Sequence, residues 1–168
     1  MPSQKELDLL VSYDQATGDL ISKVCRGRIH IGDKLGYPTA NGYLQLRLTT
    51  NGRNYLAHRI IWTLVHGTIP AGMVIDHLNG RGSDNRLANL RLATFAENSK
   101  NTKRHKHNSS GVMGVRWVAI RKRWEATIKL NGQKTYLRRF HTFEEAVACR
   151  RAAEAQYGYH PNHGRVVE

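Results

Sequence analysis

A stretch of ten residues with no regular pattern of apolar side chains interrupts this sequence. Residues 101–110 read Asn-Thr-Lys-Arg-His-Lys-His-Asn-Ser-Ser and are polar and basic. A segment of this kind has no hydrophobic face to bury, so it predicts a linker between two folded parts. A chain of 168 residues has room for two small domains around it. We therefore expect modules at residues 1–104 and 111–168, joined by a basic linker at residues 105–110.

The charge of the chain indicates a polyanionic partner. Lys and Arg number 26 against 13 Asp and Glu, which gives a formal net charge of +13. Such an excess favours binding to nucleic acid or to an acidic membrane surface. The longest apolar run, residues 60–65, is broken by Thr63, and the first residues are polar, so we expect neither a membrane-spanning helix nor a signal peptide. Cys25 and Cys149 lack the paired spacing of a zinc site, which suits a reducing cytoplasm.

The first module is predicted to be α+β. Apolar and polar residues alternate over residues 43–48, and Asn51-Gly52 suits a tight turn, so this segment and residues 53–56 predict a hairpin. Residues 57–66 carry apolar side chains at helical spacing, and a stop signal follows at Gly67. The other expected elements are helices at 7–11 and, after a Thr94–Glu97 capping box, 94–103, with strands at 19–24, 73–76 and 91–93.

The second module is predicted to be a three-stranded antiparallel sheet packed on one helix. Alternating patterns predict strands at residues 114–118, 124–130 and 133–140, and Asn131-Gly132 suits a tight turn between the last two. Thr142 and Glu145 have the spacing of a capping box, which begins a helix that ends near Gly158.

Asp76, His77 and Asn98 are the strongest candidates for chemistry. A His side chain accepts a proton near neutral pH, and carboxylate and amide oxygens are suitable ligands for Mg²⁺. Neighbours on a strand point to opposite faces, so Asp76 could reach a metal while His77 addresses a water beside it. By itself, an Asp-His pair is more often a surface or cap feature, and the polar loop at residues 78–89 is equally compatible with ordinary turns.

The surrounding segment resembles the HNH endonucleases of the phage and homing type. The resemblance covers about residues 53–104, and the spacing of His77, Asn89 and Asn98 fits the His-Asn-Asn variant of that family. It rests on Tyr55-Leu56-Ala57-His58-Arg59, Ile75-Asp76-His77-Leu78-Asn79-Gly80, Asp84-Asn85-Arg86, Asn89-Leu90-Arg91 and Glu97-Asn98.

The resemblance implies a ββα-metal fold that hydrolyses phosphodiester bonds in double-stranded DNA. His77 would be the general base, and Asn89 would brace the loop that orients it. Asp76 and Asn98 would hold one divalent ion, Mg²⁺ or Mn²⁺, in each active site, and no small-molecule cofactor is expected. His58, at a helix start, is interpreted as a packing or cap residue. Further DNA contacts are expected from Arg59, Arg81 and Arg86 near the metal and from Lys103 and Arg104 in the basic run.

The second module resembles the Apetala-two or ethylene-response-factor DNA-binding domain over residues 111–158. The resemblance rests on Gly111-Val112-Met113-Gly114-Val115-Arg116-Trp117, Arg123-Trp124-Glu125-Ala126-Thr127-Ile128, Asn131-Gly132-Gln133-Lys134, Tyr136-Leu137 and the segment that begins at Phe140. It implies that the sheet lies in the major groove, with the helix behind it. The implied contact positions are Arg116, Lys129 and Tyr136, with Arg121 or Arg123 in the first hairpin. Arg138, which stands where the family has a small Gly, is also expected to contact DNA.

Three functional hypotheses follow from the sequence. The first is a metal-dependent DNA endonuclease that nicks or fully cuts its target, as a monomer or homodimer, in the cytoplasm of a phage-infected bacterium. The second is a non-catalytic, sequence-specific DNA-binding regulator with a vestigial HNH module. The third is a basic RNA-binding protein, which would prefer structured RNA to duplex DNA and would not cut.

Overall fold

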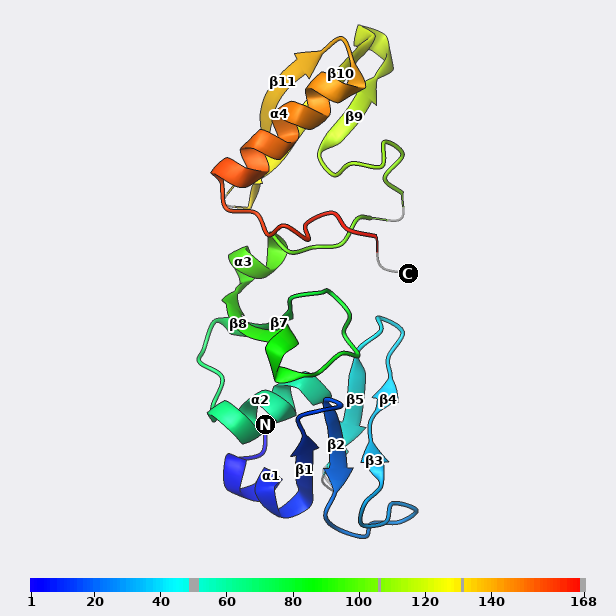
Figure 1. Ribbon diagram of the computed structural model, residues 1–168, viewed down its shortest axis with the longest axis vertical. Helices are drawn as coiled ribbons and strands as arrows, with labels where there is room; N and C mark the ends of the chain where they lie inside the picture. The colour runs from blue at the N-terminus through cyan, green and yellow to red at the C-terminus, as the bar shows by residue number, and fades with distance from the viewer. Residues whose placement is uncertain (49–51, 106, 131, 167–168) are drawn as a thin grey trace. The chain divides into compact units, whose positions relative to one another are not determined.

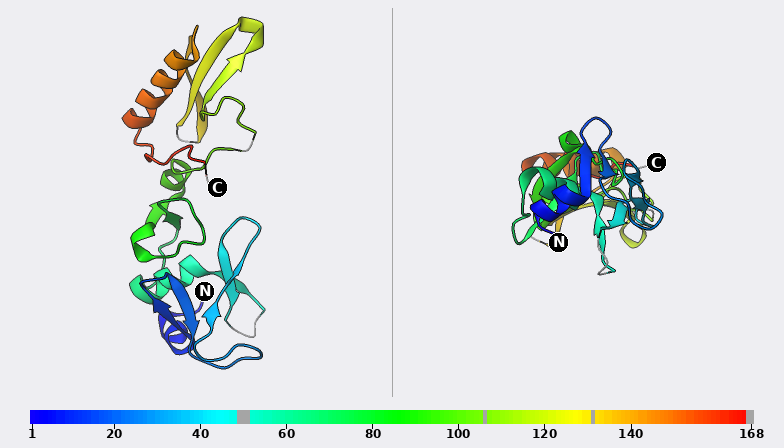
Figure 2. Two further views of the ribbon diagram at one scale, coloured as in Figure 1. Left: turned by 45° about the vertical axis from the view of Figure 1, so that its right-hand side comes forward. Right: turned by 90° about the horizontal axis from the view of Figure 1, so that it is seen from below.

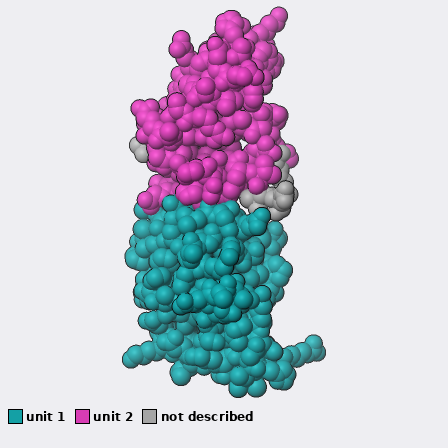
Figure 3. Space-filling model, viewed as in Figure 1, with its two compact units in different colours: residues 1–94 teal, residues 95–168 magenta. Residues whose placement is uncertain are grey.

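The computed structural model describes residues 1–48, 52–105, 107–130 and 132–166. The chain divides into two compact units, residues 1–94 and residues 95–168, which Figure 3 colours separately. Helices and antiparallel sheets occur in both units, so the chain is a mixed α+β protein, as predicted. The unit boundary falls at Thr94, upstream of the predicted module boundary at residue 104, and the functional modules stay a prediction.

The first unit begins with a helix and a three-stranded sheet (Figure 1). Helix α1 (Gln4–Leu10) begins earlier than the predicted residues 7–11, because Ser3 and Glu6 form a capping box. Strands β1 (Val11–Asp14) and β2 (Asp19–Ser22) form a hairpin, and β3 (Lys34–Leu35) pairs with β2.

A second sheet and a helix complete the support of the first unit. The sheet contains β4 (Tyr37–Pro38), β5 (Leu44–Arg47) and β6 (Asn54–Leu56), which confirms the predicted hairpin. Gly52 has a φ of +74°, whereas Asn51 lies outside the described residues. Helix α2 (Ala57–His66) has the predicted bounds and ends at Gly67, whose φ is +82°.

A short antiparallel pair carries the candidate site. Strand β7 (Met73–His77) pairs with β8 (Leu90–Thr94), which confirms both predicted strands. The loop between them ends in a single 3₁₀ turn, η1 (Leu87–Asn89). The pair and the helices share one hydrophobic core, whose buried members are Leu7, Val11, Leu20, Leu35, Leu46, Leu48, Ala57, Ile60, Ile61, Ile75 and Leu90.

The second unit contains the predicted three-stranded sheet and helix. Strands β9 (Val115–Val118), β10 (Arg123–Leu130) and β11 (Gln133–Phe140) lie in the order β11-β10-β9. The 3₁₀ turn η2 (Ala119–Arg121) connects β9 to β10. Helix α4 (Phe143–Gln156) packs along one face of the sheet (Figures 1 and 2). Its capping box between Thr142 and Glu145 is confirmed, whereas Asn131 of the predicted turn lies outside the described residues.

Helix α3 (Phe95–Ser99) is shorter than the predicted helix at residues 94–103. Thr94 is the last residue of β8, so the helix begins after it. At the other end, the hydroxyl of Ser99 donates to the carbonyl of Ala96, and that of Thr102 donates to the carbonyl of Ser99. Hydroxyls that bond nearby carbonyls compete with the helical pattern, which accounts for the early end.

Part of the polar stretch at residues 101–110 pairs with the C-terminal tail. The backbone N–H of Arg104 donates to the carbonyl of Arg165 at 2.9 Å, and that of Gly164 donates to the carbonyl of Thr102 at 2.9 Å. Asn101 is only 3% exposed and accepts a hydrogen bond from the Arg165 guanidinium. Residues 101–104 therefore belong to the folded second unit through polar contacts that composition does not reveal, and Lys106 lies outside the described residues.

The buried Arg150 of α4 joins the helix to the sheet and also pairs with Glu154 on the same helix. The Arg150 guanidinium donates to Glu154 at 2.9 Å and to the carbonyl of Thr127 on β10 at 2.6 Å. Arg150 is 3% exposed, so this helix face is held by charge-assisted hydrogen bonds as well as by Ala146 and Ala153.

Of the helices that the structure describes, none has both the length and the apolar composition needed to cross a membrane.

Candidate active site

His77 is the last residue of β7 and is only 4% exposed. Its Nε2 lies 3.0 Å from Oδ1 of Asn85, in the loop that follows the strand. An amide oxygen only accepts hydrogen bonds, so with the amide in this orientation Nε2 of the neutral ring carries the proton and Nδ1 carries the lone pair. The His77 ring also contacts the rings of His58 and Tyr43, with centroid separations of 4.9 and 5.7 Å.

The protein environment keeps both histidines of this cluster neutral. Burial lowers the pKa of His77 from its ordinary value of 6.5, although the hydrogen bond with Asn85 and two nearby carboxylates act in the opposite direction. Burial, together with His77 and Arg59, lowers the pKa of His58 to about 3. At pH 7 both rings are therefore uncharged, which is the form in which an imidazole accepts a proton.

Asp76 precedes His77 on β7 and is 6% exposed. Its Oδ2 accepts hydrogen bonds from Nε and Nη2 of Arg91, at 3.0 and 2.8 Å. Arg91 is the register partner of Asp76 on β8, so the strand pairing itself brings the two side chains together. A buried carboxylate without a cation would be costly, and Arg91 offsets that cost.

Asn89 fastens the loop between β7 and β8 at two points. Its Oδ1 accepts from the backbone N–H of Asn79 at 2.9 Å, and its Nδ2 donates to the backbone carbonyl of Asp84 at 2.8 Å. The side-chain Nδ2 of Asn79 also donates to the Asp84 carboxylate at 2.8 Å. These contacts provide a physical basis for the bracing role predicted for Asn89, and that role in catalysis stays a prediction.

Asn98 lies on α3, in the second compact unit. Asp76 and His77 lie in the first unit, so the convergence of Asn98 with them stays a prediction. Carboxylate and amide oxygens suit a hard divalent ion. Among the described residues, no group of three or more His, Cys, Asp or Glu side chains is placed to hold a metal.

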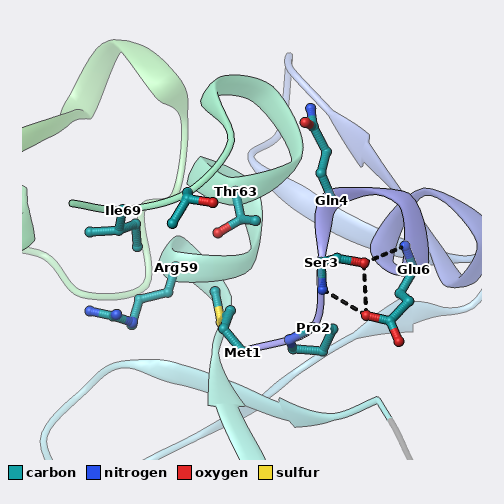
Figure 4. Close-up of a pocket in the computed structure, with 9 residues that line it drawn as sticks. Met1, Pro2, Ser3, Gln4, Glu6, Arg59, Thr63 and Ile69 are labelled. Carbon is teal, nitrogen blue, oxygen red and sulfur yellow. Dashed lines mark hydrogen bonds between the residues drawn. The ribbon is translucent and has the colours of Figure 1, made fainter. Parts of the chain in front are cut away.

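Three arginines predicted to contact DNA near this site have different surroundings in the first unit. Arg86 pairs with Asp84 at 2.7 Å, and Arg81 donates its backbone N–H to Asn79 Oδ1 at 2.8 Å. Arg59 lines a cavity of about 380 Å³, together with Ile69 and with the N-terminal residues Met1, Pro2, Ser3, Gln4 and Glu6 (Figure 4). Arg81 and Arg86 thus lie on the loop that follows His77, whereas Arg59 lines the N-terminal cavity.

Three residues whose side chains contact His77, namely Asn85, Tyr43 and His58, were not identified from the sequence as functional. Asn85 matches an ordinary polar turn, and Tyr43 matches only the alternating pattern of a strand. His58 is interpreted as a packing residue, and it is indeed buried, at 5% exposure. Tyr43 and His58 are distant from His77 in the sequence, and the contact of Asn85 depends on the conformation of the loop, so spacing alone gives no signal for them.

The second unit presents a positively charged sheet face on the side opposite α4. Trp124 contacts Phe143 of α4, so its strand neighbour Glu125 points to the other face. The buried Glu125 carboxylate binds Arg116 at 2.7 Å and Arg139 at 3.5 Å. By strand register, the described residues of this cationic face are Arg116, Val118, Arg123, Glu125, Thr127, Lys129, Lys134, Tyr136 and Arg139.

Four of the predicted DNA contacts, Arg116, Arg123, Lys129 and Tyr136, lie on the cationic face. Arg139, whose sequence context gives no signal of DNA contact, also lies on this face, and its guanidinium carbon lies 5.1 Å from the Tyr136 ring centroid. Arg138 instead pairs in register with Ala126, on the side of α4. The remaining predicted contacts of this unit lie off the cationic face. Arg121 lies on η2, Lys103 is exposed, and the Arg104 side chain donates a hydrogen bond to the carbonyl of Gly111.

Residues 55–100 match the HNH endonuclease family. Protein 3.8 of Escherichia phage T7 is 40% identical over 77 residues, which are 46% of this chain and 64% of that protein. An uncharacterised HNH endonuclease of Acanthamoeba polyphaga mimivirus is 32% identical over 114 residues, 67% of this chain and 54% of that protein. A putative HNH homing endonuclease, YosQ, from the SPbeta prophage of Bacillus subtilis is 28% identical over 99 residues, 57% of this chain and 54% of that protein.

The chain spans between about half and two thirds of the length of these curated relatives. Among solved structures, the HNH homing endonuclease I-HmuI is similar, with a TM-score of 0.45 and 18% identity over 92% of this chain and 90% of that one. The segment of this chain that matches the HNH endonuclease family is thus the segment that contains Asp76, His77, Asn89 and Asn98.

Proposed function

We propose that this protein is a metal-dependent DNA endonuclease with His77 as its general base. The observation that carries the proposal is the buried, neutral imidazole of His77, with Nε2 hydrogen-bonded to Asn85 and Asp76 as its neighbour. A ring fixed in this way keeps the basic lone pair on Nδ1. It could accept a proton from a water aligned with a phosphodiester bond, the task of a general base.

The candidate metal ligands fit a hard divalent ion. The Asp76 carboxylate and the Asn98 amide are oxygen donors of the kind that Mg²⁺ and Mn²⁺ prefer, and substrate phosphate oxygens would add further ligands. A divalent ion in this place would supply positive charge beside the scissile phosphate. In this proposal the chain would contribute two oxygen donors and one neutral base.

We assign DNA binding to the cationic face of the second unit. Arg116 is exposed but is oriented by Glu125, so its guanidinium is presented in a fixed direction. A guanidinium so presented can donate two hydrogen bonds to guanine O6 and N7, whereas Lys129 is suited to phosphate. This arrangement agrees with the resemblance of residues 111–158 to the Apetala-two domain.

The ion pair between Asp76 and Arg91 favours a second candidate, a DNA-binding regulator without nuclease activity. Arg91 binds the carboxylate of Asp76, the candidate metal ligand, and so competes with a metal ion for that carboxylate. Under this hypothesis the protein binds duplex DNA but does not cut it.

A plasmid assay separates the two candidates. The endonuclease proposal expects supercoiled DNA to be relaxed or linearised with Mg²⁺ or Mn²⁺, and to stay intact with EDTA. Asp76→Asn should bind the same DNA but cut it far more slowly. An intact plasmid under all metal conditions, with tight binding, would establish the regulator instead. Preferential binding to structured RNA would contradict both candidates.

A further inference from the structure

The loop that carries Asn85 is held by a hairpin outside the stretch that matches the HNH family. Tyr13 on β1 donates its hydroxyl hydrogen to the backbone carbonyl of Asn85 at 3.2 Å. The same hydroxyl accepts from the backbone N–H of Leu87 at 3.1 Å. One tyrosine side chain therefore fixes the backbone on both sides of Arg86, next to the residue that contacts His77.

The turn of this hairpin lies directly against the same piece of backbone. Gly18 has a φ of +82°, and a Cβ placed on it would come within 2.7 Å of the backbone nitrogen of Arg86 and 2.9 Å of the carbonyl carbon of Asn85. Neither atom belongs to a flexible side chain that could move away. Only glycine permits both this backbone conformation and this approach.

The hairpin is itself well anchored. The Asp14 carboxylate accepts from the N–H of Ala16 and from the hydroxyl of Thr17, each at 2.9 Å, which closes the turn. Val11 and Leu20, on its two strands, are 1% and 2% exposed in the core. A support built into the core can hold the loop without moving.

Asn85 joins this support to the imidazole. Its backbone is held by Tyr13 and Gly18, its side chain contacts Nε2 of His77, and it is only 1% exposed. In the same loop, Gly82 lies against the Tyr43 ring, where a Cβ would come within 2.6 Å. Residues of the N-terminal hairpin and Tyr43 therefore both pack against the loop that contacts the ring of His77.

We propose that Asn85 is a positioning residue for His77, and that Tyr13 and Gly18 of the N-terminal hairpin hold Asn85 in place. Asn85 keeps the proton of the neutral ring on Nε2 and so directs the basic lone pair to Nδ1. The inference rests on the proposed general-base role of His77. It assigns part of the active-site support to a segment that precedes the HNH motif.

Two substitutions at Asn85 test the role of its side chain. Asn85→Ala removes the acceptor, and loss of such an orienting contact typically costs about 10- to 100-fold, which we expect to find in kcat with unchanged KM for duplex DNA. Asn85→Asp keeps an acceptor for Nε2–H and should recover most of the lost rate. Equal loss of rate in both variants, at equal folded fraction, would overturn the proposal.

The hairpin is tested with matched pairs. Tyr13→Phe removes both hydroxyl contacts and should lower kcat several-fold, whereas Tyr37→Phe makes the same change at an exposed strand residue and should not. Gly18→Ala should lower kcat, whereas Gly32→Ala, with a φ of +91° and no atom within 4 Å of the added Cβ, should not. Equal effects within each pair would contradict a positioning role for the hairpin.

A spectroscopic measurement is independent of cleavage. Long-range ¹H–¹⁵N correlation spectra of histidine-labelled protein report which ring nitrogen of His77 carries the proton. We expect Nε2–H in the wild type and a mixture of tautomers in Asn85→Ala. Protonation at Nδ1 in the wild type would overturn the positioning role, whether or not the protein cuts DNA. If the wild type carries Nε2–H on His77 but does not cut DNA, only the proposed nuclease function is refuted.

Discussion

The imidazole rings of His58 and His77 meet edge to face, with 4.9 Å between their centroids. His58 comes from the first turn of α2 and His77 from the end of β7, so this contact joins the helix to the strand that carries the candidate base. Within the part of the chain that the structure describes, the buried Nδ1 of His58 has no hydrogen-bond partner. We therefore expect His58 to act through the shape of its ring, as a wall of the His77 site.

Replacing His58 should separate ring shape from ring polarity. His58→Ala leaves a cavity beside His77 and should lower the free energy of unfolding by about 2 to 4 kcal/mol. His58→Phe keeps an aromatic ring and removes an unsatisfied buried nitrogen, so it should change stability by less than about 1 kcal/mol. Urea unfolding measures both, with His66→Ala on the exposed end of α2 as the control. A similar loss in His58→Phe and His58→Ala would show that the imidazole nitrogen matters.

The Asp84 carboxyl should make stability depend on acid pH. Hydrogen bonds from Arg86 and from Asn79 lower its pKa from 3.8 to about 2. A lowered pKa stabilises the folded state above the unfolded value of 3.8, and this contribution disappears as pH falls towards about 2. Asp84→Asn should therefore cost about 1 to 2 kcal/mol at pH 7, and much less near pH 2. Urea unfolding at both pH values, beside the exposed Asp8→Asn, tests this, and a cost that does not change with pH would contradict it.

Glu125 should control how selectively the second unit binds DNA. Its carboxylate orients Arg116 and Arg139 on the cationic face. Glu125→Ala removes a negative charge, so binding to unrelated DNA should become tighter, while discrimination at the base read by Arg116 should fall by about 1 to 3 kcal/mol. Binding measured against a selected target and a scrambled duplex tests this. An unchanged ratio of the two affinities would show that Arg116 does not read a base.

The salt dependence of DNA binding should identify phosphate contacts. If Lys129 binds a phosphate, Lys129→Ala should reduce the slope of log K against log salt by about 1. Lys34→Ala, in an ion pair with Asp19 of the first unit, makes the same change away from the cationic face and should leave the slope unchanged. Equal slopes for both variants and the wild type would remove Lys129 from the interface.

Local patterns predicted the elements whose signals lie within a few residues. The capping box at Thr142 and Glu145, the alternation over β10 and β11, and the helical period of α2 correspond to the observed elements. Helix α3 ended early because hydroxyl-to-carbonyl bonds, which a propensity argument does not weigh, compete with the helix.

The candidate site was predictable only in part. The motif indicated Asp76 and His77, but nothing in the spacing indicated that Tyr13 would bond the backbone beside Asn85 or that Arg91 would pair with Asp76. Such contacts depend on strand register and on how a hairpin packs against a distant loop. Likewise, only the strand register, which pairs Arg139 with Glu125, shows that Arg139 belongs to the cationic face.

Single-turnover cleavage at saturating DNA and Mg²⁺ tests the central claim most directly. His77→Ala should cut about 10² to 10⁴ times more slowly than the wild type, the usual contribution of a general base, while its affinity for the same DNA stays unchanged. His66→Ala, a histidine on the exposed end of α2, should cut at the wild-type rate. Cleavage by His77→Ala at the wild-type rate would contradict the account.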